Sequence, residues 1–137
     1  MGTNTVNTFE NEDAANWLPD FLSGSDLGLV KLALETADVD ADEYLEAPEG
    51  AVAVAAIEIV AACMGRPGPS VLANDDLSAW LNEFKPRPGP RLVELALDVL
   101  HRVTGANSEL ADLMGESGDQ GDEWCEEMRE LAGRLGG

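Results

Sequence analysis

Residues 48–64 read PEGAVAVAAIEIVAACM, and this stretch decides the fold. Its apolar residues continue around every side of a helix, a pattern that is typical of a helix buried on all faces. The run is too short to span a bilayer, which requires about 20 apolar residues. Pro48 suits a first helical turn, and Gly65 and Pro67 favour an end just after the segment. We therefore predict a central helix over residues 48–64.

Amphipathic helical segments surround this central helix in the sequence. Apolar residues recur at helical spacing, and capping residues or Gly- and Pro-rich breaks separate the segments. The further helices are predicted over residues 11–23, 25–37, 75–84, 91–104, 108–115 and 121–135, after a polar N-terminal arm of residues 1–9. Strand patterns are nearly absent, and only residues 43–46 favour a short extended piece. The prediction is all-α: residues 1–137 form a single compact bundle of six to seven helices around an Ala/Val/Ile-rich central helix.

The charge balance restricts the kinds of partner. The chain has 27 acidic residues against eight basic ones, a formal net charge of −19. Nucleic acids and anionic membranes require a cationic patch, so neither is an expected direct partner. A basic protein partner fits the charge, because complementary charge accelerates encounter and selects partners. The alternative is a surface that only keeps the protein soluble at high ionic strength.

The compartment is predicted from the cysteines and the first residues. Cys63 and Cys125 are too few for a disulfide framework, so we expect reduced thiols. Residues 1–10, MGTNTVNTFE, lack the basic start and apolar run of a signal peptide. We expect a cytoplasmic protein.

Residues 38–49, DVDADEYLEAPE, follow part of the pattern of a calcium-binding EF-hand loop. Carboxylates occupy loop positions one, three, five, nine and twelve; they belong to Asp38, Asp40, Asp42, Glu46 and Glu49. Position six, which is glycine in such loops, is Glu43, and no second loop of this kind exists in the sequence. We interpret the stretch as an acidic connector between two helices, with calcium binding as the alternative.

A second set of carboxylates lies on predicted helices. Glu94, Asp98 and His101 form a polar stripe, and Asp98 and His101 have the carboxylate-x-x-His spacing of metal-carrying bundles. His101 is the only histidine, however, and the alternative is a solvated edge on which Asp98 pairs with Arg102.

Glu58 lies midway along the most apolar helix. A buried carboxylate must find a partner or take up a proton, and Arg91, Arg102 or a Trp indole N–H are the candidate partners. A structural hydrogen bond is the favoured role of Glu58.

The three tryptophans lie on predicted helices. Core packing is the expectation for Trp17, Trp80 and Trp124.

Several stretches together resemble a bacterial family catalogued as domain of unknown function 4259. They are FENEDAANWL at residues 9–18, YLEAP at 44–48, AAIEIVAA at 55–62, ALDVLHRV at 96–103, NSELADLM at 107–114 and LAGRL at 131–135. They cover nearly the whole chain in order. The departure is at the front, where the family opens with a Trp and several glycines and this chain has Asn4, Thr5 and Asn7. The resemblance implies no activity, cofactor or catalytic residue, and it favours the connector interpretation because YLEAP belongs to the family pattern.

No nucleophile elbow, thiol-protease signature or phosphate-binding glycine loop is present in the sequence. We therefore predict no catalytic residue and no cofactor. The sequence favours a small acidic interaction module that binds a basic partner, as an immunity protein or an inhibitor does. The alternative is a metal-binding protein or metal-dependent enzyme that uses the carboxylates named above.

Overall fold

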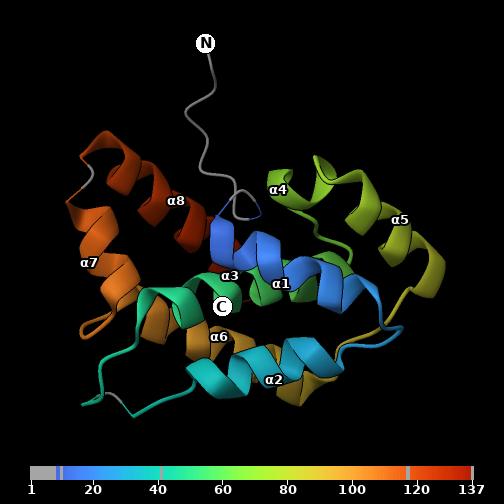
Figure 1. The fold of residues 1–137 in the computed structure, drawn as a ribbon, viewed down its shortest axis with the longest axis horizontal. Coiled ribbons are helices and arrows are strands. Elements are labelled where there is room, and N and C mark those ends of the chain that lie inside the picture. The colour runs from blue at the N-terminus through green and yellow to red at the C-terminus, as the bar shows by residue number, and fades with distance from the viewer. Residues whose placement is uncertain (1–8, 10, 41, 117, 137) are drawn as a thin grey trace.

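The computed structural model describes residues 9, 11–40, 42–116 and 118–136, apart from the side chain of Gln120. These residues form eight helices and no strand (Figure 1). The helices are α1 Glu12–Leu22, α2 Gly28–Ala37, α3 Ala47–Cys63, α4 Pro69–Leu72, α5 Asp75–Phe84, α6 Pro90–Thr104, α7 Glu109–Gly115 and α8 Asp119–Arg134. The all-α prediction is confirmed.

Helix α3 is the centre of the fold. Helices α1, α2, α4, α6, α7 and α8 all pack against it, and in Figure 1 α1 crosses in front of it while α2 lies below it, in front of α6. Within residues 50–61, every residue of α3 is buried except Val52, which is partly exposed. The many alanines leave little side-chain bulk, so the surrounding helices approach closely. The predicted central helix is confirmed.

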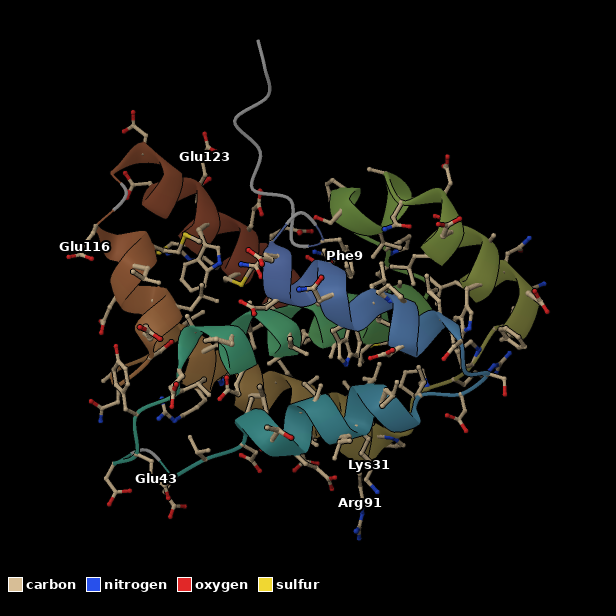
Figure 2. The ribbon with its side chains drawn as sticks, in the orientation of Figure 1. Phe9, Lys31, Glu43, Arg91, Glu116 and Glu123 are labelled. Atoms are coloured by element: carbon tan, nitrogen blue, oxygen red, sulfur yellow. The ribbon has the colours of Figure 1, made fainter. Side chains whose placement is uncertain are left out.

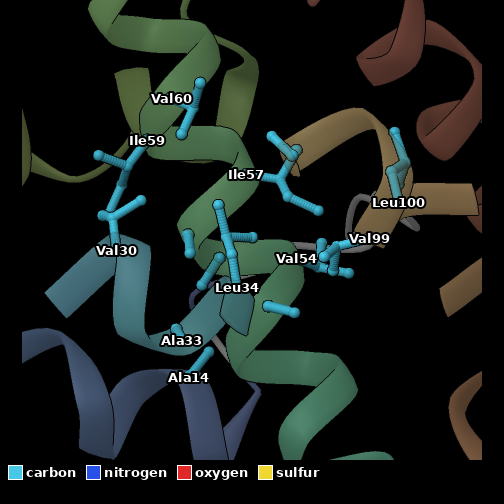
Figure 3. Close-up of a cluster of buried hydrophobic side chains, with 14 of the residues drawn as sticks. Ala14, Val30, Ala33, Leu34, Val54, Ile57, Ile59, Val60, Val99 and Leu100 are labelled. Atoms are coloured by element: carbon cyan, nitrogen blue, oxygen red, sulfur yellow. The ribbon is translucent and has the colours of Figure 1, made fainter. Parts of the chain in front are cut away.

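The core is mostly aliphatic. Helix α2 places Val30 and Leu34 against α3, and α6 brings Val99 and Leu100 to the same cluster as Ile57 (Figure 3). All five side chains are at most 1% exposed. Such packing is close to crystal density, so the loss of a methyl group from these side chains lowers stability.

An aromatic chain joins α1 to α5. The ring centroids of Trp17 and Phe21 lie 5.5 Å apart, those of Phe21 and Trp80 4.4 Å apart, and those of Trp80 and Phe84 5.0 Å apart. Trp80 Nε1 also donates to the carbonyl of Gly24 at 2.8 Å. Trp80 and Trp124 are buried as predicted, whereas Trp17 is only partly covered.

Two helix boundaries differ from the prediction for local reasons. Helix α2 begins at Gly28 and not at Ser25. The N–H of Gly28 donates a hydrogen bond to Asp26 Oδ1 at 3.0 Å, and this turn places Ser25 outside the helix. In the Gly- and Pro-rich break between the predicted helices 48–64 and 75–84, the structure has a further single-turn helix, Pro69–Leu72, which raises the helix count above six to seven. Of the predicted arm, only Phe9 is described, and its side chain is buried in the core.

None of the helices in the described part of the chain is long and apolar enough to cross a membrane.

Candidate functional site

The most deeply buried charge is the carboxylate of Glu58, on α3. It is 4% exposed, and its partner is Arg134 at the end of α8. Arg134 Nη1 donates to Glu58 Oε1 at 3.1 Å and Nη2 donates to Oε2 at 3.4 Å. Arg134 Nε donates to both carboxylate oxygens of Glu130, each at 2.9 Å. The candidate partners Arg91, Arg102 and a Trp indole are therefore wrong, because the packing of α8 brings in a side chain 76 positions away along the chain.

The loop after α3 encloses the Arg134 guanidinium. Nη1 of Arg134 donates to the carbonyl of Arg66 at 3.2 Å, and Nη1 of Arg66 donates to the carbonyl of Arg134 at 2.8 Å. Gly68 lies so close that an added Cβ would sit 2.7 Å from Arg134 Nη1. These contacts join Glu58 of α3, and the loop after α3, to the end of α8. The favoured structural role of Glu58 fits this geometry.

Burial raises the pKa of the Glu58 carboxyl above its ordinary value, although the hydrogen bond and charge of Arg134 oppose the shift. Burial also tends to lower the pKa of Arg134, but Glu58 and Glu130 outweigh it and the pKa is raised. Arg134 therefore stays charged, and Glu58 is the member of the pair whose proton uptake is favoured by burial.

The raised pKa of Glu58 predicts a pH dependence of stability. Between the ordinary carboxyl pKa and the raised one, the folded chain holds a proton that the unfolded chain has released. The free energy of unfolding therefore falls as pH rises through this window, by at most about 1.4 kcal/mol per pH unit from this group. Urea unfolding of the wild type and of Glu58→Gln across the window measures the effect as the difference between the two chains. A pH-independent difference would contradict it.

The acidic connector, residues 38–46, is organised around Arg102 of α6. The Arg102 guanidinium donates to the carbonyls of Asp40 and Glu43, and also to those of Ala106 and Asn107. Leu45 forms one parallel bridge with Ser108, which is the extent of the extended piece predicted at residues 43–46. A cationic side chain thus satisfies backbone carbonyls inside the connector.

The candidate metal ligands are distributed as follows. The connector side chains of Asp38, Asp40, Asp42 and Glu46 are exposed, and Glu49 lies on α3. Glu94, Asp98 and His101 are exposed on α6, and Glu58 is paired with Arg134. The predicted Asp98–Arg102 pair is wrong, because Arg102 turns to the connector. Within the described residues, no group of three or more His, Cys, Asp or Glu side chains is placed to hold a metal ion.

The cysteines are free and differ in exposure. Cys125 is exposed, whereas Cys63 is partly buried. Burial raises the pKa of the Cys63 thiol to about 11, which keeps it protonated and a poor nucleophile near neutral pH.

The fold gathers carboxylates that are far apart in the sequence. Leu45 N–H donates to the carbonyl of Asn107 at 2.8 Å, and Tyr44 Oη donates to Asp112 Oδ2 at 3.1 Å, so the connector lies against the start of α7. In Figure 2, Glu116 lies at the left edge of the molecule, Glu123 lies nearer the top and Glu43 nearer the bottom. We give the name acidic side to nine exposed carboxylates: those of Asp38, Asp40, Asp42, Glu43 and Glu46 on the connector, of Glu116 just after α7, and of Asp119, Asp122 and Glu126 on α8.

The acidic residues are unevenly distributed along the sequence. Residues 1–63 contain thirteen acids and one base, residues 106–137 nine acids and two bases, and residues 64–105 five of each. Residues 64–105, whose net charge is zero and which we call the neutral third, form α4, α5 and α6. The pKa of Tyr44 is raised, first by partial desolvation and then by Asp112, Glu109 and Glu116, which is the direction expected in a negative field.

Comparison with known proteins supports the resemblance seen in the sequence. A family described as "Domain of unknown function (DUF4259)" matches residues 2–127. No match was found among curated proteins or among solved structures. Because the matched region spans nearly the whole chain, this protein belongs to the family of domain of unknown function 4259.

Proposed function

We propose that this protein is an acidic interaction module that binds a basic protein partner through the acidic side. The observation that carries the proposal is the meeting of two acidic segments, the connector and the α7–α8 region, at the bridge between Leu45 and Ser108. Together they present nine exposed carboxylates, while the net charge of the segment that forms α4, α5 and α6 is zero.

The charge at this surface is available to a partner. Glu116, Asp119, Asp122 and Glu126 form no ion pair among the described residues, and their spacing on α8 places Asp119, Asp122 and Glu126 toward one side of that helix. The one arginine that reaches the connector binds its backbone carbonyls. A cluster of like charge attracts a cationic surface and orients it before contact.

Two variants with the same change in net charge test the proposal. The first neutralises the acidic side with Asp42→Asn, Glu43→Gln, Glu116→Gln and Asp122→Asn. The second neutralises exposed acids of the neutral third with Asp76→Asn, Glu83→Gln, Glu94→Gln and Asp98→Asn. The partner is recovered from the native host at low salt, produced in pure form, and titrated by calorimetry against each chain.

We expect a basic partner whose dissociation constant rises with salt concentration. The acidic-side variant should weaken binding about ten-fold or more, a loss of about 1.4 kcal/mol, and the matched variant by less than about three-fold. A partner without excess positive charge, or salt-insensitive binding, would overturn the proposal. Equal losses of affinity for the two variants would mean that the partner responds only to net charge, and would overturn the proposal as well.

A further inference from the structure

An apolar groove of about 350 Å³ opens between α1 and α2, with α3 beneath it. Trp17 of α1, Leu29 and Leu32 of α2, and Val52 of α3 contribute its apolar surface. Its volume lies in the lower part of the range of about 300–1,000 Å³ that is typical of binding pockets. We call it the α1–α2 groove.

This groove is the place where the cover of the central helix is incomplete. Helices α1 and α2 both pack on α3, but they leave Val52 partly exposed in a run that is otherwise buried from residue 50 to residue 61. Leu32, on the rim, is 57% exposed. A large aliphatic side chain that is mostly in water, beside a half-covered core residue, can bury further apolar area only when another molecule covers it.

The polar rim of the groove is anionic. Asp13 of α1 and Glu49 of α3 line it, and no lysine or arginine does among the residues that the structure describes. Lys31, the neighbour of Leu32, lines a different groove together with Arg91, and both project from another edge in Figure 2. The apolar surface is thus bordered by charge of the sign that attracts a cationic segment.

One end of the groove lies near the two ends of the connector. Thr36, near the end of α2, and Pro48, near the start of α3, both line it, and the connector joins these two helix ends. Asp38 and Glu46, the first and last carboxylates of the connector, are each two residues along the chain from one of these lining residues. The carboxylates at the ends of the connector therefore add negative charge near this end of the groove.

We infer that the α1–α2 groove receives a cationic amphipathic helix of the protein partner; this inference rests on the proposed function. Apolar side chains of that helix cover Leu32 and Val52, and its lysines or arginines pair with Asp13 and Glu49. Helix-in-groove recognition of this kind uses anchors at i, i+3, i+4 and i+7. A second copy of this chain fits poorly, because two bodies of charge −19 repel each other.

The test uses two defined probes. One is a peptide of leucine and lysine with leucines at i, i+3, i+4 and i+7, and the other is oligolysine with the same number of lysines. Each is titrated at low salt against the wild type, Leu32→Gln and the matched control Leu72→Gln, whose leucine is 64% exposed on α4. The double variant Asp13→Asn/Glu49→Gln is compared with Asp76→Asn/Glu83→Gln, which alters the acids of a separate groove by α5.

For the leucine–lysine peptide, Leu32→Gln should weaken binding about ten-fold or more and Leu72→Gln less than two-fold, since a few central anchors dominate such interfaces. Asp13→Asn/Glu49→Gln should weaken it more than the control pair does. Oligolysine affinity should not respond to Leu32→Gln. In NMR spectra, the indole N–H of Trp17 should shift on binding, whereas the buried Trp80 and Trp124 serve as references.

The outcomes separate the two claims. If oligolysine binds but Leu32→Gln and Leu72→Gln affect the leucine–lysine peptide equally, the groove is not the docking site and the proposed function stands. If neither probe binds at low salt, the proposed function fails and the inference fails with it. If sedimentation shows a wild-type dimer that Leu32→Gln dissociates, the groove receives a second copy and the inference is wrong.

Discussion

Replacing Arg134 by alanine is expected to lower the free energy of unfolding by about 3–5 kcal/mol, the usual penalty for breaking a buried ion pair. The side chains of Arg134 and Glu58 are only 12% and 5% exposed, so water does not replace the lost guanidinium. Glu58 would then have to bind a proton or remain charged in an apolar environment. The carbonyl of Arg66 would also lose a donor. Urea denaturation followed by circular dichroism measures the change.

Arg129→Ala is the matched control, because Arg129 is an exposed arginine on the same helix. It should change stability by no more than about 0.5 kcal/mol. The double variant Glu58→Met/Arg134→Met should recover most of the loss, since apolar residues of similar volume often replace a buried pair without penalty. If Arg134→Ala and Arg129→Ala had equal effects, the buried pair would not stabilise the fold.

Replacing Ile57 by alanine is expected to destabilise the protein by about 2–5 kcal/mol. Ile57 is fully buried on α3, with α2 and α6 packed close by, so the lost atoms leave a cavity that the surrounding helices fill only in part (Figure 3). Thermal or urea unfolding gives the value directly.

Val52→Ala is the comparison on the same helix. Val52 opens onto the α1–α2 groove, so its truncation removes less buried area and should cost less than about 1 kcal/mol. A loss as large as that of Ile57→Ala would mean that Val52 is covered in solution. That result would argue against an open groove as well as against the difference in packing.

Local patterns were sufficient to predict most helices. The segment 75–84 matches α5 residue for residue, because Asn74 is a strong cap whose Oδ1 accepts from the N–H of Leu77 at 3.0 Å. Ser108 does the same for α7, where its hydroxyl accepts from Ala111 N–H at 3.3 Å. The central helix followed from its apolar composition alone. Helix α4 was missed because a single turn after a proline has no periodicity to detect.

The contacts between distant segments could not be predicted in the same way. No spacing rule links Glu58 with Arg134, and the role of Arg102 depends on how α6 lies beside the connector. The connector meets the start of α7 through the bridge between Leu45 and Ser108 and the hydrogen bond from Tyr44 to Asp112, so the sequence shows the charge but not where it gathers. The α1–α2 groove depends on how α1 and α2 pack against α3. The sequence of a single helix does not show that packing.

The position of Arg134 also bears on how the chain is made. A ribosome delivers residue 58 before residue 134, so the nascent α3 carries the Glu58 carboxylate without its counter-ion until Arg134 has been added. Helix α8 cannot pack against α3 until α8 has left the ribosome, and until then the apolar surface of α3 is accessible to chaperones. A chain that ended between these two residues would therefore lack the ion pair that joins α3 to α8.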